Sequence, residues 1–89
     1  MRVKILKRFW RFLFVSVADL PRGADGECDD PTTPDKSIRV WEKLQGERQL
    51  AVTVHETLHA ADWHKSEEWI EEVSNDLARI LWRLGYRRQ

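Results

Sequence analysis

The chain has 89 residues, of which 42% are hydrophobic, and its fifteen Lys and Arg residues balance fifteen Asp and Glu residues to a net charge of zero. A chain of this length forms one small domain that buries only ~65% of its unfolded surface. The single cysteine, Cys28, excludes an internal disulfide and fits a reducing compartment. We therefore expect one domain over residues 1–89, in the cytoplasm, that a bound metal would help to stabilise.

The charge is unevenly placed along the chain. The first eleven residues carry five cations and no acid. Such an arm could touch nucleic acid or a membrane surface. Because no known nucleic-acid module accompanies it, we interpret it as the outer face of a solvated strand pair and expect no nucleic-acid partner. The apolar run 12–15 is too short and too interrupted by charge for a signal peptide, and no other segment is long enough to span a bilayer.

Three segments alternate polar and apolar residues and are predicted to be strands. Residues 2–6 and 10–17 follow one another closely, which indicates a hairpin turning at 7–9; a helix is the alternative, because this region lacks Gly and Pro. Residues 37–44 form the third strand, exposed on one face. The Pro-, Gly- and Asp-rich segment 21–35 between them is predicted to be an irregular connection.

Two helices follow the strands. The first runs from about Glu47 to Asp62, and the second begins at Ser66, a good N-cap, and stops at Gly85. The order predicts an α+β domain with a small antiparallel three-stranded sheet followed by two helices. The residues expected to form the apolar stripes are Leu50, Val54, Leu58 and Ala61 on the first helix, and Trp69, Ile70, Val73, Leu77, Ile80, Leu81 and Leu84 on the second.

The first helix contains the motif His55-Glu56-Thr57-Leu58-His59. Residues four apart lie one above the other on a helix, so His55 and His59 can present their imidazoles to one metal ion. Glu56 lies ~100° round the helix, where its carboxylate can take a proton from a water that the ion activates. Both histidines project away from the predicted apolar stripe. The alternative is a pair of ordinary surface or inter-helix histidines.

A catalytic zinc needs a third protein ligand. Glu67 is our first choice, because it borders the apolar stripe of the second helix and lies near the turn that brings this helix back. Glu68 and Glu71 are the alternatives. His64 would give a three-histidine site, but no glycine supplies the sharp turn such a site usually needs, so we expect a loop residue there.

The segment from Gly26 to Arg88 resembles small zincin-like proteins encoded by phages and prophages, akin to the minimal gluzincins. The matching pieces are Gly26-Glu27-Cys28-Asp29, Ser37-Ile38-Arg39-Val40, the motif from His55 to Ala61, Glu67-Glu68, and Leu81 to Tyr86. The resemblance implies zinc held by His55, His59 and a glutamate among Glu67 and Glu68, with Glu56 as base. It also implies an edge strand, assigned here to 37–44, that aligns an extended peptide.

The resemblance leads us to expect a zinc-dependent metallopeptidase that hydrolyses peptide bonds. The alternative is a phage or prophage structural or interaction protein that keeps the zincin fold and the zinc but cleaves nothing. Tyr86 and His64 are the only neutral side chains after the motif that could stabilise an oxyanion, and the sequence does not place either beside the metal.

Overall fold

The alternating N-terminal segments form a hairpin in the computed structural model, which describes residues 1–88. Strand β1 (Arg2–Ile5) pairs antiparallel with β2 (Arg8–Val15). Leu6 and Lys7 make the two-residue turn with φ angles of 47° and 68°. Positive φ at both central residues is the type I′ geometry that suits the twist of a hairpin. The hairpin is confirmed, and its turn lies slightly earlier than predicted because neither residue is the usual Asn or Gly.

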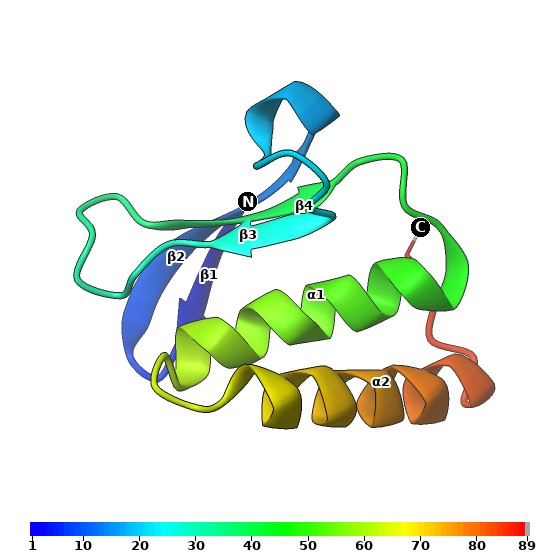
Figure 1. The fold of residues 1–89 in the computed structure, drawn as a ribbon. Coiled ribbons are helices and arrows are strands. Elements are labelled where there is room, and N and C mark those ends of the chain that lie inside the picture. Colours follow the sequence, from blue (N-terminus) through cyan, green and yellow to red (C-terminus); the bar gives the residue numbers. More distant parts are fainter. Residues whose placement is uncertain (89) are drawn as a thin grey trace.

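The other two strands join this hairpin in a mixed sheet (Figure 1). Strand β4 (Ser37–Trp41) pairs parallel with β2, and β3 (Gly26–Cys28) pairs antiparallel with β4, which gives the order β1-β2-β4-β3. The α+β class is therefore confirmed, whereas the expectation of three antiparallel strands is wrong. Alternation shows which residues share a face, but it carries no information on strand direction.

The strand at 37–44 is not an edge strand, contrary to expectation. β4 is paired with β2 on one side and with β3 on the other, so neither of its edges is free. The two edge strands of the sheet are β1 and the short strand β3, and β3 lies inside the segment predicted to be irregular. Three residues containing a glycine are too few to show an alternating pattern.

Both helices lie on the same side of the sheet, with α1 (Gly46–Ala61) in contact with β3 and β4, and α2 (Glu67–Arg83) packed against α1 (Figure 1). The Ser66 hydroxyl accepts a hydrogen bond from the Trp69 amide, which confirms the predicted N-cap. Gly85 has a φ of 93° and its amide donates to the Trp82 carbonyl, which confirms the predicted end of α2. Of the described residues, no helix is both long and apolar enough to cross a bilayer.

The buried faces of the helices differ from the predicted stripes. On α1 the buried residues are Ala51, Val52, Glu56 and Ala60, and on α2 they are Ile70, Ser74 and Ala78. Helix α1 contacts the sheet and α2 at once, so its apolar residues are divided between two faces instead of forming one stripe. On α2, Ile70 of the predicted stripe is buried as expected, whereas the predicted residues Trp69, Leu77, Ile80 and Leu84 are exposed.

Candidate metal centre

Three donor groups converge where the end of α1 meets the start of α2. The Nε2 atoms of His55 and His59 lie 3.1 Å apart. One carboxylate oxygen of Glu67 lies 2.8 Å from the first of these atoms, and its other oxygen lies 2.9 Å from the second. The connection 62–66 is short, so the first turn of α2 lies beside the last turns of α1. These three residues form a group that could hold a metal ion.

The size of this triangle suits a small cation. A tetrahedral zinc ion bonds nitrogen and oxygen ligands at about 2.0–2.1 Å, which places the ligand atoms ~3.3–3.4 Å from one another. The two Nε2 atoms are 3.1 Å apart and each lies 2.8 or 2.9 Å from its own oxygen of Glu67, so each of these separations needs to widen by only about half an ångström or less. Two imidazole nitrogens and a carboxylate are also donors that zinc binds readily.

Glu71 supports the site from the second turn of α2. Its carboxylate lies 3.1 Å from Nδ1 of His55, the ring nitrogen that faces away from Glu67. A hydrogen bond donated from Nδ1 to this carboxylate would leave the lone pair of Nε2 free for a metal ion. Glu71, one of the alternatives for the third ligand, is thus placed to orient His55.

The other candidate ligands lie outside this group. Glu68 is exposed, and it contacts neither histidine in the described part of the chain. His64 is an exposed residue of the turn between the helices, as expected, and the nearby acid that its charge influences is Asp30. The three-histidine arrangement is therefore not formed by residues 1–88.

Glu56 lies in the same hollow as the three donor groups but is buried beneath it. The hollow has a volume of about 630 Å³ and is lined by Gly26, Glu27, Cys28, His55, Glu56, His59, Trp63, Lys65 and Glu67. Burial of Glu56 raises the pKa of its carboxyl to about 7, and the negative charge of Glu67 contributes to the same shift. The motif thus places two histidines in the donor group and the carboxyl of Glu56 in the same hollow.

The edge strand β3 reaches this carboxyl because it contains a glycine. A Cβ atom added to Gly26 would lie 2.8 Å from Cγ1 of Val52 and 3.0 Å from both Cγ and Oε2 of Glu56. No side chain fits at this position without displacing the side chains of Val52 and Glu56. Gly26 therefore sets how closely the sheet edge approaches the site, which is one of the functions of glycine inside strands.

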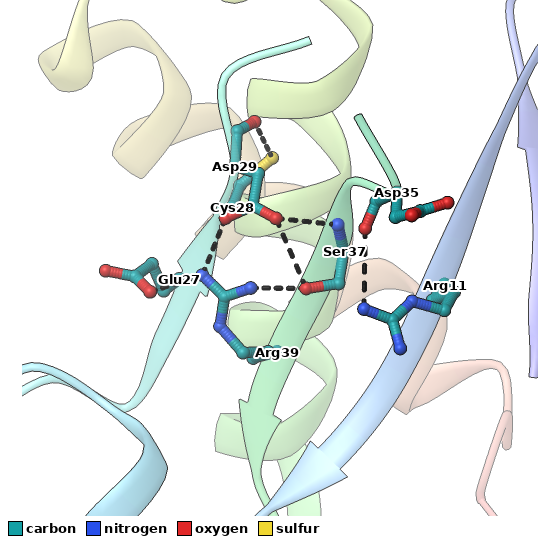
Figure 2. A network of polar contacts seen from close by, with 7 residues as sticks. All are labelled: Arg11, Glu27, Cys28, Asp29, Asp35, Ser37 and Arg39. Carbon is teal, nitrogen blue, oxygen red and sulfur yellow. Dashed lines mark hydrogen bonds and ion pairs between the residues drawn. The ribbon is translucent and has the colours of Figure 1, made fainter. Parts of the chain in front are cut away.

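A network on the side of β3 and β4 away from α1 holds the edge strand in register (Figure 2). The Arg39 guanidinium binds the carboxylates of Glu27 and Asp29 and the hydroxyl of Ser37. Asp29 also accepts a hydrogen bond of 2.8 Å from the Ser37 amide. These bonds, chiefly the one from Arg39, hold the pKa of Asp29 below its usual range. Arg39 thereby joins β3 to β4 directly behind the hollow.

Several residues of the hollow were not found from the sequence. Gly26, Glu27 and Cys28 come from the segment predicted to be a connection, and Trp63 and Lys65 come from the turn between the helices. Tyr86, considered for oxyanion stabilisation, lines a different hollow together with Leu50 and Trp82. Residues 26–28 belong to the Gly26-Glu27-Cys28-Asp29 piece of the resemblance, and this is the one signal that could have found the edge strand.

Comparisons with known proteins identify no family for this chain, so the geometry of the site is the basis for proposing a function. Scans against protein-family models, curated proteins and solved structures return no match. The chemistry of the donor set and its surroundings therefore carries the functional argument.

Proposed function

We propose that this chain is a zinc-dependent metallopeptidase of the zincin type. The proposal is carried by one observation: the Nε2 atoms of His55 and His59 lie 3.1 Å apart, and each lies within 2.9 Å of one of the two carboxylate oxygens of Glu67, with the buried Glu56 in the same hollow. Two histidines and one carboxylate, with a fourth position open, form the protein ligand set of a known class of catalytic zinc sites.

The residues around the donor triangle have distinct tasks in this proposal. When bound, zinc would polarise a water molecule and the carbonyl that this water attacks. Glu56 accepts the proton of the attacking water and returns it to the leaving amine nitrogen. Glu71 holds the ring of His55 in place. Lys65 and Trp63 line the hollow and are the side chains there that can donate to the carbonyl oxygen as it gains negative charge.

The free edge of β3 is the surface on which we propose that the peptide substrate lies. The Asp29 amide and the Asp25 carbonyl bond to β4, at Ser37 and Trp41. Polar backbone groups alternate in direction along a strand, so those of Gly26 and Cys28 face the free edge. An extended peptide can pair with them as an added strand and pass its backbone over the hollow. We therefore assign the role of aligning the substrate to residues 26–28 instead of residues 37–44.

Metal content is the first test of the proposal. Protein purified without added zinc is analysed by inductively coupled plasma mass spectrometry. The wild type should hold about one zinc per chain, while His59→Ala should hold none and melt at a lower temperature, because metal binding contributes to folding in small domains. Glu68→Gln is the matched control and should keep the metal. Full zinc occupancy in the His59 variant would refute the ligand assignment.

Peptide cleavage is the second test, and it distinguishes the metallopeptidase from the non-catalytic protein. A diverse peptide mixture is incubated with zinc-loaded wild type and with Glu56→Gln, and products are read by mass spectrometry. Glu56→Gln should keep zinc but lose turnover by several orders of magnitude, because no base remains. Equal cleavage by both would indicate a contaminant. Zinc-loaded protein that cleaves neither peptides nor proteins would instead favour the non-catalytic phage structural or interaction protein.

A further inference from the structure

The face of the sheet that the helices do not cover carries most of the basic N-terminal residues. Trp10 and Phe12 of β2 are buried beneath the helices, so their neighbours along the strand face the other way. Arg2 is paired with Arg11, and Lys4 with Phe9. Residues directly opposite each other in paired strands share a face, so these four side chains form one exposed group, here named the basic sheet face.

Within residues 1–88, the cations of this face form no ion pair with an acidic side chain. Ion pairs in residues 1–88 involve Arg39, Arg48, Arg79 and the two metal-site histidines, and none involves Arg2, Lys4 or Arg11. A concavity of about 660 Å³ lies on this face, lined by Met1, Arg2, Phe9, Trp10, Arg11, Leu13, Asp35 and Lys36. Its one carboxylate is that of Asp35. The positive charge is thus available to an anionic ligand.

An exposed aromatic ring lies at the centre of these charges. Phe9 is 50% exposed, the guanidinium of Arg2 lies 3.9 Å from the centre of its ring, and the ammonium of Lys4 lies 5.9 Å from it. The plane of a guanidinium and the ring of an aromatic residue are both surfaces on which nucleobases stack. The stacking of Arg2 on Phe9 arises only when β1 lies beside β2, so the spacing of the residues does not reveal it.

We propose that the basic sheet face binds single-stranded nucleic acid. Arg2, Lys4 and Arg11 contact successive phosphates, and a base stacks on the Arg2–Phe9 pair. Two features favour this site for a polyanion: Glu56 and Glu67 line the hollow on the other side of the sheet, and the acids on this side at β3, Glu27 and Asp29, are paired with Arg39. Phe9 lies against a charged side chain instead of projecting beyond it, which favours stacking over insertion into a membrane.

Fluorescence anisotropy with a labelled oligo(dT) of 15 nucleotides tests this proposal, on protein as purified. Three phosphate contacts predict that affinity falls ~20-fold between 50 and 200 mM salt. Arg2→Glu/Lys4→Glu should weaken binding by at least about tenfold and flatten the salt dependence. Phe9→Ala should weaken it by about tenfold through lost stacking. All three side chains are exposed, so circular dichroism should show an unchanged fold.

The matched control is Arg79→Glu/Arg83→Glu, which alters the net charge equally on α2, on the far side of α1 from the sheet (Figure 1). It should lose less than threefold in affinity, and the zinc-site variant Glu56→Gln should lose nothing. An equal loss in the control, or no wild-type binding at 50 mM salt, would overturn the proposal. Binding to vesicles containing phosphatidylserine without binding to oligo(dT) would also overturn it, in favour of a membrane surface. The wild-type salt series decides the question even if a variant fails to fold.

Discussion

Replacing Gly26 with alanine should disturb the contact between the sheet edge and α1 without replacing any of the three proposed metal ligands. The added Cβ would lie 2.8 Å from Val52 and 3.0 Å from Glu56, whereas ordinary contacts begin at 3.4 Å, so the neighbours must move by 0.6 and 0.4 Å. Both neighbours are themselves buried, at 4% and 8% exposure, and cannot turn into solvent. Crowding of this kind costs about 1–3 kcal/mol.

A smaller opposing effect must be subtracted from this cost. Gly26 does not have a positive φ, so alanine is compatible with its backbone and restricts the unfolded chain, which stabilises the protein by about 0.4–1 kcal/mol. The net loss of unfolding free energy should be about 1–2 kcal/mol. In a domain of this size that corresponds to a melting temperature lower by roughly 5–15 °C. Circular dichroism at 222 nm during heating measures it.

A double-mutant cycle shows whether crowding is the cause. In a Val52→Ala background the closest clashing atom is absent, so Gly26→Ala should cost at least about 1 kcal/mol less than in the wild type. Zinc content should stay at one per chain in both backgrounds, because Gly26 contacts none of the three donor groups, while peptide cleavage should fall as Glu56 is displaced. An unchanged cost in the Val52→Ala background, or a Gly26→Ala protein as stable as the wild type, would refute the steric argument.

Three further predictions concern groups near the site. Glu71→Gln should weaken zinc binding about 10- to 100-fold in a chelator competition, since His55 loses its orienting carboxylate, while Glu68→Gln should change nothing. Burial raises the pKa of the Cys28 thiol to about 12. At pH 8, iodoacetamide should therefore label Cys28 at least about a hundredfold faster in guanidinium than in the folded protein. Equal labelling rates would refute the burial of this thiol. The hydrogen bond from Arg39 lowers the pKa of Asp29, so the ionised carboxylate stabilises the folded state above the ordinary Asp pKa of 3.8, and this stability is lost as the pH falls below that value. Urea titrations from pH 6 to pH 2.5 should therefore show a smaller loss of unfolding free energy for Arg39→Met than for the wild type.

The proposed metallopeptidase and the proposed nucleic-acid face lie on different parts of the fold. The first is formed at the contact of α1, α2 and β3, and the second on the opposite side of the sheet, at β1 and β2 (Figure 1). Variants of one site leave the residues of the other untouched, so the two proposals can fail separately. A protein that binds single strands and also cleaves peptides would have its two ligands on opposite sides of one sheet.

The sequence by itself determined the features that depend on local spacing. The i, i+4 histidines and the Ser66 and Gly85 helix boundaries follow from helix geometry and capping, which involve residues within one or two turns. The hairpin follows from alternation in two neighbouring segments. Even Glu67 could be chosen from the sequence, because the short connection after His59 limits which part of α2 can lie beside the histidines.

Only the tertiary structure decided the features that depend on segments far apart in the chain. Three features join residues that are distant in the chain: the parallel pairing of β2 with β4, the position of β3 at an edge of the sheet, and the contact of Gly26 with Glu56. The periodicity of neighbouring residues contains no information about such contacts. The same is true of the basic sheet face, where Arg2 meets Phe9 across a strand pair. Local spacing determines which side chains share one face of a helix or strand, whereas the packing of the whole chain determines which other residues that face contacts.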